Sequence, residues 1–460
     1  MKKLITLVLA LSIIISAFAI PTAALTEADL TGFKHTLVMQ SANGLSYTGD
    51  DVLFYGKYQM RGMAISQDGK YAFGGYLNPS GSSAIEMFDL NTGMVVSGIQ
   101  HIQPENSKSS YPKGLATDDR GYLYAALAYN PNNTRADIAT YSYADGQLKQ
   151  VGYANIVTTS ESVKTGVNGI TVENINGSYF AYVIVNYDVD YLARFIVDDP
   201  TNPILDASFG SGGLIDLQKD PYNLTEANYL DVDTDGTIYL GCKDSSTQKL
   251  IVLSADGSSI LNSVEQTKAY GVAIWNSYVF VTTQDSGKFC IYDKTTLTLI
   301  GTNELTTDNI ALPIDRDDIL INIGANSLCN VTVVGDVLFL GDQGSGASGL
   351  DQIFAVGLTP AAEATVNGYA KGIHDRLALA YPEKTEASET TAAPADETTA
   401  PPADETTVGE EVTEVVTTAA PTTNAPTTEA PAKEKGCGGM VAGIAIIAII
   451  GTAVIIRKKD

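Results

Sequence analysis

The sequence contains few cysteines, few histidines and few basic residues. Only 4 cysteines and 3 histidines occur in 460 residues, and 28 basic residues stand against 53 acidic ones. The net charge of −25 opposes binding to nucleic acid, which is driven by neutralisation of phosphates. The histidines lie far apart and offer no zinc-type spacing. The sequence also lacks a nucleophile elbow, a phosphate-binding loop and a dinucleotide fingerprint, so the enzyme classes that these motifs mark are disfavoured.

The cysteines do not form a recognisable disulfide framework. Cys242, Cys290 and Cys329 fall in three different predicted strands, and we interpret them as small buried apolar residues. Cys437 lies in a glycine-rich segment near the C-terminus. We interpret it as part of a spacer, with lipidation or processing as the alternative.

Both ends of the chain carry long apolar runs. Lys2 and Lys3, the apolar run 4–20 and the small residues 22–24 have the layout of a secretory signal peptide, so we predict a signal peptide over residues 1–24. Cleavage after Ala19 is the alternative. Residues 440–456 are apolar or small and uncharged, which predicts one transmembrane helix at the short limit of a bilayer span.

Cationic residues follow the predicted transmembrane helix directly. Residues 457–460 read Arg-Lys-Lys-Asp and would remain on the inner side as a cytoplasmic tail. The expected location is therefore the cell membrane, with a single pass and an extracellular ectodomain. The glycine-rich segment, the helix and the basic tail together resemble the C-termini of Gram-positive surface proteins. The sortase pentapeptide of wall-linked relatives is absent, which argues against a covalent wall link.

Residues 383–435 differ sharply in composition from the rest. Thr, Pro, Ala and Glu dominate, no aromatic residue occurs, and the unit Pro-Ala-Asp-Glu-Thr-Thr appears at 394–399 and 402–407. Such a segment cannot bury enough apolar surface to offset its ordering entropy. We predict a disordered stalk, which could reach roughly 150 Å if extended at about 3.1 Å per residue.

The segment 27–380 is the predicted folded ectodomain and consists of repeats. Each unit has an apolar-small-apolar strand, a tight polar turn and a strand rich in aromatics. The units begin at these residues: Arg61, Lys113, Asn168, Asn228, Tyr270 and Cys329. Further strands follow in most units, so each unit is predicted to be four antiparallel strands. Helical periodicity is found only near residues 370–380.

This pattern predicts an all-β fold, a six-bladed β-propeller of four-stranded antiparallel blades. Glycine and alanine recur on the first strand of a unit, as at Gly62 and Ala64, where blades converge on the axis. A strand at 36–40 could close the ring by pairing with the last blade. Seven blades are the alternative, because residues 302–326 could contain extra strands, with 319–321 as one candidate.

The Gly-apolar-Ala-apolar, Asp-x-x-Gly and apolar-Tyr-apolar stretches resemble NHL or YVTN-type propeller repeats. The resemblance covers about residues 55–358 and is clearest in the first two units. It implies the propeller architecture and little about function. The fourth unit has Tyr229 and the sixth has Asn330 where the others have glycine, so distortion of these two blades is expected.

Residues 231–238 match the opening of a calcium loop, with Asp231, Asp233 and Asp235 at alternate positions. Position twelve of such a loop would be a bidentate glutamate, and here it is Cys242. We therefore favour a plain hairpin turn, with bound calcium as the weaker alternative, and predict no other cofactor.

The residue before each first-strand motif should line one mouth of the central channel. These residues are Arg61, Lys113, Asn168, Asn228, Tyr270 and Cys329. Propeller enzymes such as gluconolactonase-like proteins are known for a metal held by acidic and amide groups near such a mouth. This ring has two cations and two amides but no carboxylate, which favours an anionic or polyhydroxyl ligand. Solvation of the channel entrance is the simpler alternative.

Three functions fit the sequence. The first is a monomeric, non-catalytic surface module that binds an extracellular protein or a polysaccharide. The second is an anchored lactonase or lyase acting on extracellular sugars, for which acidic residues such as Asp188, Asp190 or Asp231 would be needed. The third is a structural envelope protein. The absence of a catalytic constellation favours the first, and an enzyme is left open.

Overall fold

The computed structural model describes part of the chain. The described residues are 32–40, 59–77, 83–100, 111–128, 136–156, 165–187, 190–243, 248–284, 287–313, 327–343 and 351–380. The predicted signal peptide, stalk, transmembrane helix and cytoplasmic tail lie outside these ranges. Among the helices of the described ranges, none is long and apolar enough to cross a membrane.

The described strands form six blades; blades one to five are each built by consecutive antiparallel strands, and the sixth combines three consecutive antiparallel strands with two strands from earlier in the chain. Blade one contains β2 (Met60–Ile65), β3 (Tyr71–Tyr76), β4 (Ala84–Asp89) and β5 (Met94–Gln100). Blade two contains β6 (Tyr111–Thr117), β7 (Tyr122–Ala128), β8 (Ile138–Ser142) and β9 (Lys149–Ala154). Blade three contains β10 (Thr165–Ile175), β11 (Ser178–Tyr187), β12 (Tyr191–Ile196), β13 (Ile204–Leu205) and β14 (Leu214–Asp216).

The second half of the ring repeats the same plan. Blade four contains β15 (Ala227–Val232), β16 (Ile238–Cys242), β17 (Lys249–Leu253) and β18 (Ile260–Glu265). Blade five contains β19 (Ala269–Trp275), β20 (Tyr278–Thr283), β21 (Lys288–Asp293) and β22 (Leu299–Glu304). Blade six contains β24 (Leu328–Val334), β25 (Val337–Asp342) and β26 (Gln352–Gly357), together with β1 (His35–Gln40) and the short β23 (Ile310–Ala311).

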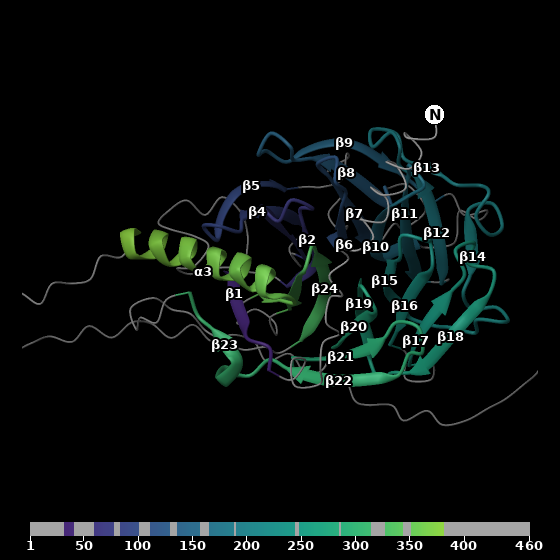
Figure 1. Ribbon diagram of the computed structural model, residues 1–460. Helices are drawn as coiled ribbons and strands as arrows, with labels where there is room; N and C mark the ends of the chain where they lie inside the picture. Colours follow the sequence, from purple (N-terminus) through teal and green to yellow (C-terminus); the bar gives the residue numbers. More distant parts are fainter. Residues whose placement is uncertain are drawn as a thin grey trace, which may run out of the picture. The chain divides into compact units, whose positions relative to one another are not determined.

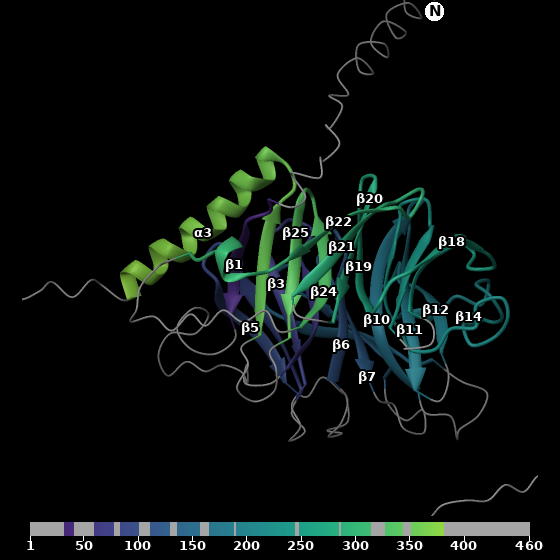
Figure 2. The same ribbon diagram turned by 90° about the horizontal axis from the view of Figure 1, so that it is seen from below.

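The six innermost strands contact one another in a closed ring. β2 lies beside β6, and the series continues through β10, β15, β19 and β24 back to β2. Figure 1 shows the blades arranged around this ring, and Figure 2 shows them from a direction turned by 90°. The predicted six-bladed propeller is therefore confirmed, and the seven-bladed alternative is wrong. The proposed extra strand at 319–321 lies outside the described residues.

The ring is closed by the N-terminal strand. β1 pairs antiparallel with β26, with Leu37 opposite Phe354, and β23 pairs parallel with the other edge of β1. The predicted closure by residues 36–40 is confirmed. In the described residues 305–313 that follow β22, the chain forms a 3-10 turn, η2 (Thr307–Asn309), and β23, which belongs to the sheet of blade six.

The helix α3 (Pro360–Ala380) packs against the two strands that close the ring, β26 and β1, and is longer than the predicted 370–380. Its N-terminus is capped by Thr359, whose hydroxyl accepts a hydrogen bond from the Ala362 amide at 3.2 Å, and Pro360 occupies the first helical position. The buried residues follow helical spacing and pack against β26 and β1: Ala362, Val366, Tyr369, Ile373 and Leu377. The Tyr369 hydroxyl donates to the Gly69 carbonyl of blade one at 2.7 Å.

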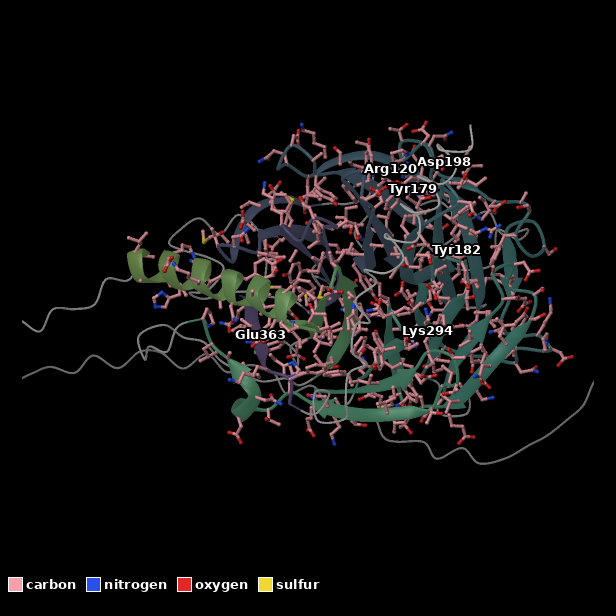
Figure 3. The ribbon with its side chains drawn as sticks, viewed as in Figure 1. Arg120, Tyr179, Tyr182, Asp198, Lys294 and Glu363 are labelled. Carbon is pink, nitrogen blue, oxygen red and sulfur yellow. The ribbon has the colours of Figure 1, made fainter. Side chains whose placement is uncertain are left out.

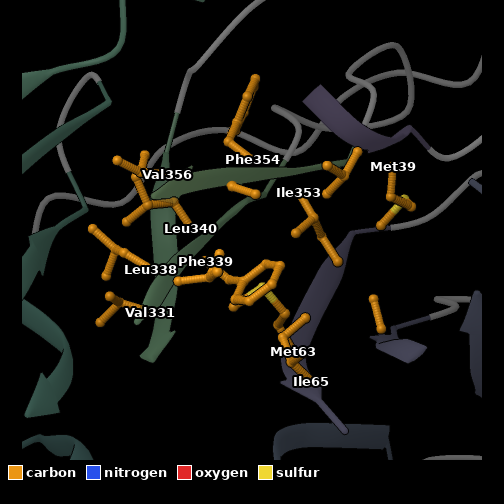
Figure 4. Close-up of a cluster of buried hydrophobic side chains, with 14 of the residues drawn as sticks. Met39, Met63, Ile65, Val331, Leu338, Phe339, Leu340, Ile353, Phe354 and Val356 are labelled. Atoms are coloured by element: carbon orange, nitrogen blue, oxygen red, sulfur yellow. The ribbon is translucent and has the colours of Figure 1, made fainter. Parts of the chain in front are cut away.

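The hydrophobic core is divided among the interfaces between blades. Separate clusters of buried side chains lie between blades one and two, two and three, three and four, and four and five. A larger cluster joins blades five, six and one with β1 and α3. Figure 4 shows part of it, where Met63 and Ile65 of blade one lie near Phe339 of blade six. Cys242, Cys290 and Cys329 are buried, as predicted, and no disulfide joins them.

Polar contacts also join neighbouring blades. The Arg120 guanidinium of blade two lies 3.5 Å from the Tyr179 ring centroid of blade three and donates to the Val197 and Asp198 carbonyls, both at 2.9 Å. Its other partner is the buried Asp118 carboxylate, at 2.7 Å. Figure 3 shows Arg120, Tyr179 and Asp198 gathered at this interface. A guanidinium that bonds to both blades in this way restricts the angle between them.

Glycines on the innermost strands allow those strands to approach closely. A Cβ on Gly114 would lie 2.6 Å from the Asn168 carbonyl oxygen, and a Cβ on Gly169 would lie 2.5 Å from that of Asn228. Because real Cβ atoms do not approach backbone oxygens so closely, each glycine is required by the backbone of the next blade. This confirms the interpretation of the recurring glycines as a consequence of convergence on the axis.

Two glycines of α3 provide a test of how this helix is seated. Gly368→Ala places a methyl group in open space, whereas Gly372→Ala drives one into the Asn91 carbonyl oxygen of blade one. We expect Gly368→Ala to stabilise the protein by about 0.5–1 kcal/mol, because alanine is the better helix former. Gly372→Ala should destabilise it by about 1–3 kcal/mol through the clash. Urea unfolding of the two variants measures the difference, and equal effects would contradict the seating.

Candidate functional site

Each innermost strand carries a β-bulge near its start. The pairing register between first and second strands shifts at the same place in all six blades, for example between Met60 and Gly62 and between Leu328 and Asn330. The residues within these shifts include Arg61, Lys113, Asn168, Asn228, Tyr270 and Cys329, which we call the bulge ring. Bulges are known to re-aim side chains. Here they bring every residue of the predicted channel mouth to one end of the channel.

The members of the bulge ring differ in exposure. Arg61 and Lys113 are half-buried, whereas Asn168, Asn228 and Tyr270 are each only 1% exposed. The Lys113 ammonium donates to the Asn168 side-chain oxygen, and the Asn168 amide donates to the Ala227 carbonyl at 3.3 Å. Two predicted ligand-binding residues, Arg61 and Lys113, thus retain exposed surface at the mouth. The two amides and Tyr270 are more deeply buried than these two cations.

Three cations from three blades meet at this end of the channel. Arg61 comes from β2, Lys113 from β6, and Lys243 follows β16. The pKa of Lys113 is lowered to about 8, mainly by burial and further by repulsion from Lys243 and Arg61, while Glu226 acts in the opposite direction. We call these three residues the cationic mouth. An anion bound among them would be attracted by all three cations and would reduce the repulsion between them.

The Arg61 guanidinium is held in place by amide side chains. It donates to the Gln343 side-chain oxygen at 3.1 Å and to the Gln59 side-chain oxygen at 2.5 Å. Its buried Nε finds no hydrogen-bond partner among the described residues. Cys329 donates its thiol to the same Gln343 oxygen at 3.1 Å, and burial raises the pKa of this thiol to about 11. The thiol is therefore a packed neutral group.

Tyr229 closes the channel below the bulge ring. It stands where four other blades have glycine, and its hydroxyl donates across the axis to the Arg61 carbonyl at 2.6 Å and to the Lys113 carbonyl. Its ring packs on Tyr270 with centroids 5.1 Å apart. Tyr229 pairs normally with Gly241, and Asn330 with Gly341, so the expected distortion of blades four and six does not occur. The side chain is accommodated by the channel.

A cavity of about 470 Å³ occupies the channel on the other side of Tyr229. We call it the chamber. Its closed end is Tyr229, and its wall is formed by the innermost strands of all the blades. Its open end lies among the turns that follow these strands, where Gln67, Thr234 and Asn276 are exposed. The chamber and the cationic mouth are thus opposite ends of one channel.

The chamber is lined by carboxylates, in contrast to the mouth. Burial raises the pKa of Glu173 to about 7, with repulsion from Asp231 as the next cause, and burial raises the pKa of Asp231 to about 6. Asp231 accepts hydrogen bonds from the Ile274 amide at 2.8 Å and from the Thr171 hydroxyl at 3.1 Å, which links blades three, four and five. Asp233 forms an ion pair with Lys294 at 2.6 Å.

The three aspartates considered as calcium ligands have separate partners. Asp235 accepts from the Thr237 amide at 2.8 Å, and the Gly236 amide donates to the Asp233 carbonyl at 2.8 Å in a tight turn. Asp231 faces the chamber and Asp233 pairs with Lys294. In the part of the chain that the structure describes, no three His, Cys, Asp or Glu side chains lie close enough to hold a metal ion. The local geometry is that of the hairpin turn.

Several residues at the two ends of the channel were not predicted from the sequence. Lys243 and Gln343 each follow the second strand of a blade, so they lie beside the bulge of the first strand. Glu173 and Lys294 come from turn-proximal positions in different blades. Tyr229 interrupts the glycine pattern of the sequence. A large side chain at a position close to the axis is the signal from which a closed channel could have been predicted.

The fold and the site together define a six-bladed β-propeller whose central channel is closed by a tyrosine between a cationic and an acidic end. No protein-family model and no curated protein matches the chain. The class of protein is therefore defined by the arrangement of the blades.

Solved structures show distant likenesses. The PQQ-bound aldose sugar dehydrogenase from Streptomyces coelicolor is 12% identical with a TM-score of 0.44, covering 71% of this chain and 98% of that one. A gluconolactonase from Xanthomonas campestris is 11% identical with a TM-score of 0.41, covering 71% and 95%. The periplasmic gluconolactonase of Pseudomonas aeruginosa is 16% identical with a TM-score of 0.38, covering 53% and 69%. Likenesses this distant carry no argument about function.

Removal of the Tyr229 hydroxyl tests the closure of the channel. Tyr229→Phe loses two hydrogen bonds to buried backbone carbonyls, so we expect a loss of about 1–3 kcal/mol in the free energy of unfolding. The control is Tyr153→Phe on the outer strand β9, where the side chain is 57% exposed and the change should stay within about 0.5 kcal/mol. Equal effects in denaturant unfolding would contradict the role of Tyr229.

The raised pKa of Glu173 predicts a pH dependence of stability. A carboxyl with a folded pKa of about 7 and an ordinary value of 4.5 binds more protons when folded, so stability falls as pH rises from 4.5 through 7. Glu173→Gln should stabilise the protein by about 1 kcal/mol at pH 8, after allowance for screening by channel water, and by nothing at pH 4.5. Glu265→Gln, on the exposed edge of β18, is the control. A Glu173→Gln effect independent of pH would refute this explanation.

Proposed function

We propose that this protein is a cell-surface-anchored, non-catalytic binding module that recognises anionic groups of an extracellular polysaccharide or protein. The observation that carries the proposal is the convergence of Arg61, Lys113 and Lys243 from three blades at one end of the channel. The proposed anchoring rests on the predicted signal peptide, stalk and transmembrane helix. The described residues contain the folded part that would do the binding.

The chemistry of the mouth favours carboxylates. Guanidinium and ammonium groups form their strongest hydrogen bonds with carboxylate and phosphate oxygens. Burial and repulsion from Lys243 and Arg61 lower the pKa of Lys113 to about 8, and a bound anion would offset both effects by stabilising the charged ammonium. The Asn168 side chain accepts from the Lys113 ammonium, and the Tyr229 hydroxyl donates to the Arg61 and Lys113 carbonyls, so both residues are anchored at the mouth.

Because the net charge is −25, electrostatic attraction of an anionic ligand is confined to the cationic mouth itself. At distances beyond about 10 Å at 0.1 M salt the protein repels a polyanion only weakly, because its field is screened. Attraction therefore acts at short range, where three cations face the ligand. Binding should weaken with added salt, and a polymer would bind through the few charged units that enter the mouth.

Titration of the purified full chain with polygalacturonate tests the proposal, with neutral dextran as the comparison polymer. We expect polygalacturonate to bind and dextran not to bind. Lys113→Met should weaken binding about tenfold through loss of one charge-assisted contact. Lys149→Met, an exposed lysine on β9, is the charge-matched control and should have no effect.

The pH dependence gives a second readout. Lys113 loses its proton as pH rises through about 8, so affinity of the wild type for polygalacturonate should fall between pH 7 and pH 9. Lys113→Arg keeps its charge and should remove that fall. Equal binding of dextran, or unchanged binding by Lys113→Met, would contradict the proposal. Shortening of the polymer during the titration would favour the lyase alternative, and no binding would favour a structural envelope role.

A further inference from the structure

The chamber below Tyr229 has the size of a small-molecule site. Its volume of about 470 Å³ falls within the usual range of roughly 300–1,000 Å³ for ligand pockets. Tyr229 closes its inner end, so a ligand must enter between the exposed turns near Gln67 and Asn276. A ligand in the chamber is thus separated from one at the cationic mouth by the Tyr229 side chain.

Two carboxylates face the chamber without a cationic partner. Lys294, which lies in the lining and is labelled in Figure 3, is engaged with Asp233 at 2.6 Å. Among the ion pairs of the described ranges, none involves Glu173 or Asp231. Both acids belong to the lining. The chamber therefore offers uncompensated negative charge inside the fold.

The Asp231 carboxylate is fixed in orientation. One oxygen accepts from the Ile274 amide at 2.8 Å, and the other accepts from the Thr171 hydroxyl at 3.1 Å and the Val232 amide at 3.0 Å. These three donors come from three adjacent blades and hold the group against the chamber. Such preorganisation lowers the cost of binding, because the carboxylate does not have to be ordered by the ligand.

The lining favours a monovalent organic cation over a metal ion. Two carboxylates are available, and no third His, Cys, Asp or Glu completes a metal-holding group among the described residues. An ammonium group carries a single charge and donates three hydrogen bonds. The Gln67 amide, the Asn276 side chain and the Thr171 hydroxyl are also in the lining and suit hydroxyl groups on the same ligand.

From this arrangement we propose that the chamber is a second binding site, which takes a small molecule bearing a protonated amine beside hydroxyl groups, such as an amino sugar. The ammonium group pairs with the carboxylates of Glu173 and Asp231. The mutual repulsion between these acids contributes to the raised pKa of Glu173, and a bound ammonium relieves it. The site is independent of the anion-binding function proposed for the mouth.

Calorimetric titration of the full chain at pH 7, where the amine of the free sugar is mostly protonated, with glucosamine and N-acetylglucosamine tests the proposal. The two sugars share the ring and hydroxyl groups, and only glucosamine carries a charged amine. We expect glucosamine to bind at least about tenfold more tightly than N-acetylglucosamine, because the acetylated sugar lacks one charge-assisted hydrogen bond. Glu173→Gln should weaken glucosamine binding about tenfold, and Glu265→Gln, exposed on β18, should leave it unchanged.

The experiment has clear contrary outcomes. Equal affinity for the two sugars would show that the amine is not recognised. Unchanged glucosamine affinity in Glu173→Gln would place any binding outside the chamber. Absence of glucosamine binding at pH 7 would also overturn the proposal. Thermal unfolding of each variant confirms that it is folded, and Asp231→Asn provides a second substitution at the same site with the same expected weakening.

Discussion

The β-bulge repeated on the six innermost strands is the constraint on which the rest of the channel depends. A regular strand would alternate its side chains between the two faces of a blade, where the neighbouring blades lie. The extra residue at each bulge turns one side chain and one carbonyl toward the axis instead. Arg61 and Lys113 reach the mouth for this reason, and their carbonyls become the acceptors for the Tyr229 hydroxyl. The glycine beside the bulge then lets the next blade approach.

The channel has opposite charge at its two ends because different parts of the same strands face it. The bulges near the strand starts bring Arg61 and Lys113 together, whereas the strand ends contribute Glu173 and Asp231. Tyr229 lies between the two groups, with burial raising its pKa well above the ordinary value. It stays a neutral hydrogen-bond donor. Without this side chain the cations and the carboxylates would face a common water-filled channel and screen one another.

Much of the fold was predictable because it depends on local patterns that repeat. The Asn176-Gly177 turn has positive φ at both residues, as a two-residue hairpin requires. The predicted closing strand at 36–40 is present as β1, paired with β26 of the last blade. The start of α3 was missed, although Thr359 and Pro360 are the usual residues at such a start. Its alanine-rich first turns hid the periodicity.

The sequence alone determined that the chain forms a propeller, favoured six blades over seven, and indicated which strand of each blade lies nearest the axis. These properties follow from turn residues, alternation and the room available to glycine, all of which act within one repeat. Tertiary structure decided that Tyr229 closes the channel, that Lys243 joins Arg61 and Lys113, and that Asp231 and Glu173 share a chamber. The partners of Tyr229 lie 168 and 116 residues away in the sequence. Only ring closure brings such residues together, because contact across the axis depends on the number, tilt and spacing of all the blades.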